Sequence, residues 1–89
     1  MATASLTLIS KPGCHLCDDA REVVTSVMAE VANRPSAPHV TLDEVSILDD
    51  ADLHDRYVEE IPVLLINGRV HNYWRIDPTR LTTALLELT

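Results

Sequence analysis

The 89-residue chain has no phenylalanine, one tryptophan and two tyrosines, so aromatic side chains cannot fill its interior. It has only two glycines, which excludes a collagen-like repeat and a glycine-rich linker. A disordered chain is also excluded, because 46% of the residues are hydrophobic. We therefore expect one small α/β domain over residues 1–89 with an aliphatic core.

Basic residues are scarce as well. Seven Lys and Arg stand against fourteen Asp and Glu, which gives a formal net charge of −7. Because a protein that neutralises phosphates needs the reverse balance, we expect no nucleic-acid partner and no membrane partner. No apolar run approaches the ~20 residues of a membrane span, and Met1–Ser10 has no basic residue of a signal peptide. We expect a cytoplasmic monomer.

Only two cysteines are present, Cys14 and Cys17. Two are too few for the disulfide framework of small secreted domains. A bridge between them would close a very short loop, and chain entropy puts the resulting stabilisation near ~2 kcal/mol before strain is subtracted. Chemistry therefore explains this pair better than structural cross-linking does.

The spacing of apolar residues predicts seven elements in the order β-α-β-α-β-β-α, which gives a mixed four-stranded sheet flanked by helices. Asn67-Gly68 is a dipeptide typical of type I′ hairpin turns. Asp77 followed by Pro78 is typical of a helix N-cap and first helical residue. The strand over 39–47 changes the parity of its apolar residues, which indicates a bulge. The strands are expected over 5–10, 39–47, 61–66 and 69–74, and the helices over 16–32, 49–57 and 78–88.

The sequence Cys14-His15-Leu16-Cys17 falls where the first strand passes into the first helix. Unpaired N–H groups and the positive end of the helix dipole favour a thiolate on Cys14 there, and Lys11 and His15 add positive charge nearby. The two aspartates after Cys17 oppose that charge, so we expect a moderately acidic thiol. Cys14 is then the attacking group, and Cys17, one turn away, resolves the mixed disulfide.

This CxxC pair, with Ile61-Pro62 ahead of the third strand, resembles the glutaredoxin-like branch of the thioredoxin-fold proteins, and in particular its small uncharacterised CHLC-containing members. The resemblance covers Leu6–Leu88 and implies a thioredoxin-like fold. It implies that Cys14 is the nucleophile and Cys17 the resolving thiol of a thiol–disulfide oxidoreductase acting in electron transport and cell redox homeostasis. It also implies that Pro62 is a cis-proline beside the active site and that the backbone of Ile61 pairs with the substrate.

The stretch Val70–Asp77 departs from the glutathione-dependent members of that branch, which carry a Gly-Gly pair and an acidic residue there. The electron donor therefore stays open between glutathione, another low-molecular-weight thiol and a reductase, and no bound cofactor is expected. The expected substrate is a disulfide of a protein or of a small thiol. Trp74 either lines the substrate groove with Arg75 or is the one large ring of the core. The expected substrate-binding residues are Lys11, His15, Ile61 and Pro62.

The alternative function is a non-catalytic binding module, or a carrier of a metal or iron–sulfur cluster. A structural zinc site takes four ligands and one CxxC supplies two, so a carrier would need the cysteines of two chains. No metal site is expected within one chain, because we interpret His39, His54 and His71 as solvated or structural. The aspartates between residues 49 and 55 lack the glycine and final glutamate of a calcium loop and are interpreted as a solvated helix face.

Overall fold

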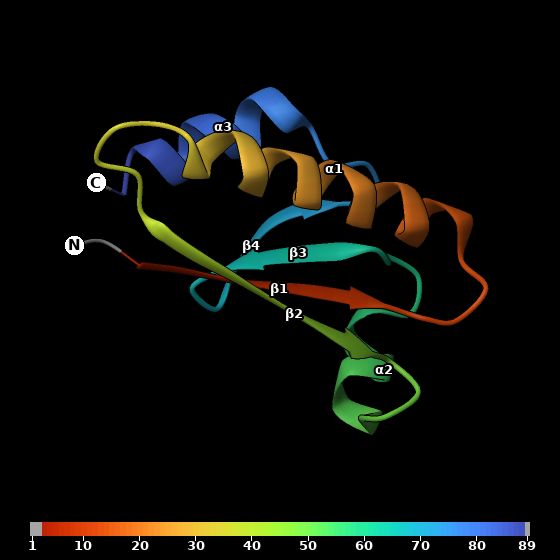
Figure 1. Cartoon of the computed structure of the whole chain (residues 1–89). Helices are drawn as coiled ribbons and strands as arrows, with labels where there is room; N and C mark the ends of the chain where they lie inside the picture. Colours follow the sequence, from red (N-terminus) through yellow and green to blue (C-terminus); the bar gives the residue numbers. More distant parts are fainter. Residues whose placement is uncertain (1–2, 89) are drawn as a thin grey trace.

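The computed structural model describes residues 3–88, so Met1, Ala2 and Thr89, at the ends of the expected domain, lie outside the described residues. Within the described part, strands and helices follow one another in the predicted order (Figure 1). The elements are β1 (Thr3–Ser10), α1 (His15–Ala32), β2 (His39–Ser46), α2 (Ala51–Tyr57), β3 (Val63–Ile66), β4 (Arg69–Tyr73) and α3 (Pro78–Leu86).

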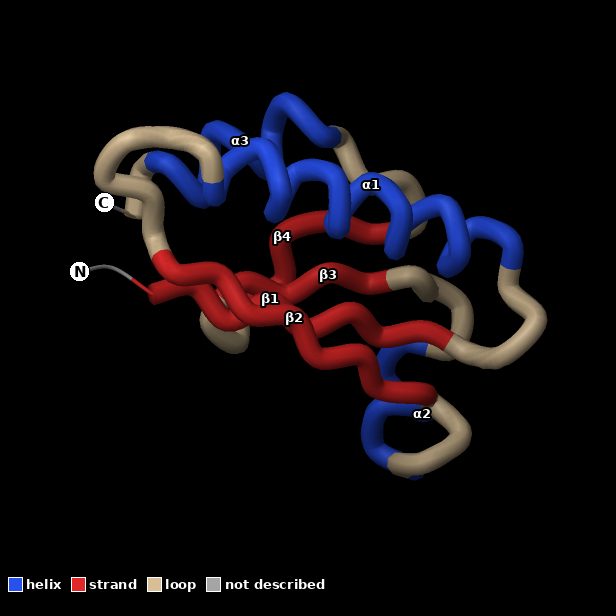
Figure 2. The backbone as a smooth tube through the Cα atoms, viewed as in Figure 1, coloured by secondary structure: helices blue, strands red, loops and turns tan. Residues whose placement is uncertain are grey.

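The strands form one sheet in the order β2-β1-β3-β4. β1 pairs parallel with β2 and antiparallel with β3, and β4 pairs antiparallel with β3. The mixed four-stranded sheet expected from the sequence is therefore confirmed. α1 and α3 lie together on one face of the sheet, and α2 lies beyond the other face, near the end where β1 runs into α1 (Figure 2).

The bulge expected in the strand over 39–47 is wrong. β2 pairs residue for residue with β1 along its whole length, and the irregularity of the sheet lies instead between Leu64 and Leu65 of β3. The parity changes because the two halves of this segment are apolar on different faces. Val40 and Leu42 pack on the side of α1, whereas Ile47 packs on the opposite side.

The buried residues form two clusters. The large cluster lies between the sheet and the pair α1 and α3, and its side chains are all aliphatic. The small cluster contains Cys17 among other buried residues, and Cys14 packs against it. Consecutive strand residues alternate between the clusters, as Leu8 and Ile9 do on β1. The large cluster consists of Ala4, Leu6, Leu8, Ala20, Val24, Val27, Val31, Leu64, Ile76, Leu81 and Leu85, and the small cluster of Ile9, Cys17, Ile47, Ile61 and Val63.

The predicted turn and cap are confirmed. Asn67 and Gly68 have φ of 50° and 83°, and type I′ turns require positive φ at both central residues. The Asn67 side-chain oxygen also accepts a 2.8 Å hydrogen bond from the N–H of Ser5, which ties the hairpin to β1. Asp77 caps α3, because its carboxylate accepts hydrogen bonds from the N–H groups two and three residues later.

α1 buries one face at helical spacing, from Cys17 through Val24 to Val31. Valine has a low helix propensity, so packing of this face against the sheet supplies much of the stability of the helix. Among residues 3–88, no helix has both the length and the apolar character needed to cross a membrane.

Candidate functional site

Cys14 and Cys17 lie where β1 hands the chain to α1. Cys14 is the N-cap of the helix, and the two residues form a disulfide with their Cα atoms 5.2 Å apart, within the range that disulfides need. The N–H of Cys17 donates a hydrogen bond of 3.1 Å to Sγ of Cys14. The predicted placement of Cys14 at the helix N-terminus, with Cys17 one turn inside, is confirmed.

The two sulfur atoms differ in accessibility. Cys14 is partly exposed, whereas Cys17 is 0% exposed and packs in the small cluster beside Ile9, Ile47 and Ile61. A substrate sulfur therefore reaches Cys14 and not Cys17. Because thiol–disulfide exchange requires direct attack of one sulfur on another, this difference in exposure distinguishes the two residues chemically.

Two basic side chains lie near Cys14 in the sequence, and both are exposed. Lys11 belongs to the loop between β1 and α1, and His15 is the first residue of α1. Gly13 in the same loop has φ of +74°, a conformation that side-chain-bearing residues rarely adopt. The loop therefore places Cys14, which is partly exposed, between two exposed basic residues in the sequence.

The first carboxylate after Cys17 is paired with a cation. Asp18 accepts a 2.8 Å hydrogen bond from Nη1 of Arg21, and Arg21 also donates to both carboxylate oxygens of Glu44 on β2, at 2.7 and 2.6 Å. Ser10 donates to the same Glu44 at 2.7 Å. The Arg21 guanidinium holds the pKa of the Glu44 carboxyl below its usual value, and Ser10 adds to this effect.

This ion-pair network was not foreseen from the sequence. The spacing of Asp18 and Arg21, three residues apart on a helix, is a signal that would have predicted their pair. No local signal identifies Glu44, because its position beside α1 depends on the parallel pairing of β2 with β1. The network matters for the site, since Asp18 carries negative charge close to the cysteine pair in the sequence. Arg21 serves the carboxylates of both Asp18 and Glu44, so it offsets the charge of Asp18 only in part.

Ile61 and Pro62 lie next to the cysteines. Ile61 is buried in the small cluster with Cys17, and the Ile61–Pro62 peptide bond is cis. The carbonyl of Pro62 accepts a 2.7 Å hydrogen bond from the N–H of Trp74. Within residues 3–88, neither the N–H nor the C=O of Ile61 has a hydrogen-bond partner. Both backbone groups of Ile61 are therefore left without a partner in the described part of the chain.

Trp74 is not the large ring of the core. It is 52% exposed, because the backbone turns at the end of β4 with φ of +60° at Trp74. Trp74 and Arg75 line a hollow of about 90 Å³ together with Leu16, which lies between the two cysteines in the sequence, and a role of this hollow in substrate binding stays a prediction. We call this space the Trp74 hollow. Its remaining lining residues are Asp19, Ala20, Val23 and Ile76.

The other histidines do not gather around the cysteines. His39 and His54 are exposed, and His71 is partly buried, which lowers the pKa of its imidazole. Among the described residues there is no group of three or more histidine, cysteine or acidic side chains arranged to hold a metal ion. A four-ligand metal site supplied by the described part of one chain is therefore not supported.

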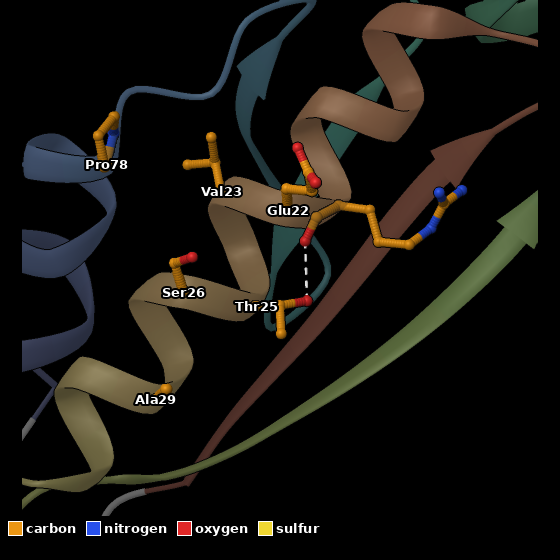
Figure 3. A pocket seen from close by; sticks show the side chains of 7 residues that line it. Glu22, Val23, Thr25, Ser26, Ala29 and Pro78 are labelled. Carbon is orange, nitrogen blue, oxygen red and sulfur yellow. Dashed lines mark hydrogen bonds between the residues drawn. The ribbon is translucent and has the colours of Figure 1, made fainter.

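A wider groove of about 780 Å³ runs along α1 toward the start of α3 (Figure 3). Thr25 in this groove donates a 2.8 Å hydrogen bond to the backbone oxygen of Arg21, one turn earlier. Neither cysteine lines the groove, so it is separate from the disulfide. Its lining residues are Arg21, Glu22, Val23, Thr25, Ser26, Ala29 and Pro78.

The sequence was compared with known families and proteins. The model of the family described as "Glutaredoxin-like domain (DUF836)" matches residues 5–86. An uncharacterized protein of Mycobacterium tuberculosis is 24% identical over 89 residues, covering 100% of this chain and 90% of that protein. The match therefore spans nearly the whole of both chains.

Solved structures were compared with the fold. The solution structure of protein XcR50 from X. campestris is 31% identical, with a TM-score of 0.69, and the match covers 100% of this chain and 97% of that one. Protein Ne2328 from Nitrosomonas europaea gives a TM-score of 0.75 at 17% identity, covering 96% and 94%. Oxidized mitochondrial thioredoxin 3 from Saccharomyces cerevisiae gives 0.63 at 14% identity, covering 99% and 81%. The expected thioredoxin-like fold is confirmed.

Proposed function

The chain belongs to the glutaredoxin-like domain (DUF836) family, and from this membership and the geometry of its cysteine pair we propose that it is a thiol–disulfide oxidoreductase. The observation that carries the proposal is the asymmetry of the pair. Cys14 is partly exposed and its Sγ accepts a hydrogen bond from the N–H of Cys17, whereas Cys17 is fully buried.

The reduced protein reacts first through Cys14. A backbone N–H aimed at Sγ and the N-terminal end of α1 both stabilise a thiolate, and Lys11 adds positive charge nearby in the sequence. The thiolate attacks one sulfur of the substrate disulfide. A bond forms between Cys14 and that sulfur, the substrate disulfide breaks, and the departing thiolate takes a proton from water.

The second step uses Cys17. Its thiol attacks Sγ of Cys14, which forms the intramolecular disulfide, and the departing second sulfur of the substrate takes the proton that Cys17 loses. Two electrons have then passed from the cysteine pair to the substrate. A low-molecular-weight thiol such as glutathione, or a reductase, returns two electrons to the Cys14–Cys17 disulfide and closes the cycle. The substrate is the disulfide of a protein or of a small thiol.

The segment before β3 supports a polypeptide among these substrates. The N–H and C=O of Ile61 are unpaired within residues 3–88, and Ile61 packs in the cluster that contains Cys17. An extended peptide can add a short strand to such free backbone groups. This pairing would hold the substrate cysteine next to Cys14, with Pro62 fixing the direction of the segment.

Two substitutions test the assignment. Cys14→Ser should abolish reduction of bis(2-hydroxyethyl) disulfide, whereas Cys17→Ser should accumulate a mixed disulfide on Cys14 that intact-mass measurement detects. Ala29→Ser, on an exposed position of α1, is the control and should behave as the wild type. The opposite pattern for the two cysteines would reverse their roles, and exchange that survives Cys14→Ser would refute the proposal.

A further inference from the structure

The single tryptophan of the chain, its largest apolar side chain, lies at the surface and not in the core. Trp74 is 52% exposed and its backbone has φ of +60°, a region that a bulky side chain rarely adopts. Such strained conformations cost free energy and are concentrated at functional sites. An exposed ring on a strained backbone therefore calls for a role outside the core.

The ring of Trp74 is held in place by neighbouring segments. Its backbone N–H donates to the carbonyl of Pro62 at 2.7 Å, and its indole Nε1–H donates to the carbonyl of Glu59 at 3.3 Å. The ring of Tyr73 is 6.0 Å away, centroid to centroid. A ring that is already ordered loses little conformational entropy when something packs against it, which favours binding.

The Trp74 hollow lies between the first turns of α1, the helix that the redox pair begins, and the segment that follows β4. Leu16, in the first turn of α1, forms one wall, and Trp74, bonded to the segment that carries Ile61, forms the other. Asp19 and Arg75, which carry opposite charges, lie at the same hollow. At about 90 Å³ the hollow has room for one side chain, and its two main walls are apolar.

We propose that Trp74 and Leu16 form a subsite that receives one aliphatic side chain of a polypeptide substrate, from the residue next to its reactive cysteine. This inference rests on the proposed function. A peptide that pairs with the free backbone groups of Ile61 runs extended, so consecutive side chains point to opposite sides. When the substrate cysteine points toward Cys14, the side chain of the next residue points to the other side of the peptide, and we place that side chain in the Trp74 hollow.

This subsite would favour binding of polypeptide substrates over binding of small thiols. Glutathione has no aliphatic side chain beside its cysteine and gains nothing from the hollow. A substrate with leucine beside its cysteine buries apolar surface against the indole and Leu16, which is favourable in proportion to the area removed from water. The proposed occupant is thus a protein disulfide with a leucine, isoleucine or valine next to the cysteine.

Kinetics with matched disulfides test the subsite. Two blocked peptide disulfides that differ only in leucine or glycine beside the cysteine are compared with bis(2-hydroxyethyl) disulfide. The wild type should prefer the leucine peptide by about tenfold in kcat/KM. Trp74→Ala should remove that preference, so that the ratio of kcat/KM for the two peptides falls to about one, whereas Trp74→Phe should retain most of it. Leu88→Ala is the control, because Leu88 is an exposed leucine that does not line the hollow.

The inference is overturned if the wild type shows no preference, or if Trp74→Ala slows all three substrates equally. A second measurement does not depend on exchange. The single indole N–H resonance should shift in NMR spectra on titration with a thiol-free Leu-Ser peptide and stay in place with Gly-Ser. If the resonance does not move with the Leu-Ser peptide, the subsite is contradicted even where exchange occurs. If the protein reduces none of the disulfides, the proposed function is refuted, and the NMR titration still tests the subsite.

Discussion

The two clusters of buried residues, one on each face of the sheet, differ in composition and in the helices that pack over them. The large cluster is wholly aliphatic and lies under α1 and α3. The small cluster contains the sulfur of Cys17, and α2 beside it contributes no fully buried residue. The difference indicates that one cluster supplies most of the stability of the fold, whereas the other places one sulfur out of reach of solvent and leaves the other accessible.

The most severe test of this division is a matched pair of substitutions on β1. Leu8 belongs to the large cluster and Ile9 to the small one, and both are almost fully buried. Leu8→Ala and Ile9→Ala should each lower the free energy of unfolding by about 2–5 kcal/mol, because each removes the same number of buried carbon atoms. Urea unfolding measures this loss.

Only one of the two variants should change the chemistry. In the reduced, folded protein, Ile9→Ala should let iodoacetamide reach Cys17, because Ile9 packs against it, whereas Leu8→Ala should leave Cys17 protected. Peptide mapping after alkylation gives the labelled fraction of each cysteine. Equal labelling of Cys17 in both variants would mean that the clusters do not divide the roles of stability and chemistry.

A smaller effect is expected from the ion pairs beside the small cluster. Arg21→Gln should lower stability at neutral pH by up to about 1 kcal/mol, since the side chains of Arg21 and Glu44 are 41% and 33% exposed and solvent screens their attraction. The pKa of Glu44 is lowered in the folded state, so this contribution is present above its ordinary value of 4.5 and is lost as the pH falls through the lowered pKa.

Thermal unfolding of wild type and Arg21→Gln at neutral and acidic pH checks this expectation: the two should differ at neutral pH and converge in acid. Arg34→Gln is the matched control, because Arg34 forms a single exposed ion pair with Glu30 on the same helix. A loss for Arg21→Gln no larger than that for Arg34→Gln would show that the bridge to β2 adds nothing.

The smallest effect concerns His71 on β4. Burial, and next the positive charge of Arg80, lower the pKa of His71 in the folded state. The unfolded chain therefore binds a proton more readily, and stability should fall as the pH drops through the ordinary value of 6.5 toward the lowered one. His71→Gln should reduce this part of the pH dependence, and His39→Gln, at an exposed histidine, should not. Parallel stability profiles for wild type and His71→Gln would contradict the prediction.

Local signals were sufficient for the elements that depend on residues close in sequence. The turn at Asn67-Gly68, the cap at Asp77 and the placement of Cys14 ahead of α1 all follow from neighbouring residue types, and all are confirmed. The family resemblance, carried by the cysteine pair and Ile61-Pro62, predicted the fold as a whole.

Features that join distant segments were not predictable in this way. The segment over 39–47 pairs in regular register although its apolar residues lie on both faces of the sheet. In the sequence, this pattern looks the same as the change of parity that a bulge produces. The contact of Arg21 with Glu44 joins residues 23 positions apart through the pairing of two strands. The exposure of Trp74 follows from its positive φ, which no local residue pattern signalled.

The central claim is that Cys14 and Cys17 change together between dithiol and disulfide. The most direct measurement equilibrates the protein in a series of redox buffers made from dithiothreitol or glutathione, followed by acid quenching, alkylation and intact-mass analysis. We predict one two-electron transition in which both cysteines are either alkylated or bridged. A singly alkylated species that carries glutathione would contradict this prediction. So would a cysteine pair that stays fully reduced or fully oxidised across the whole series.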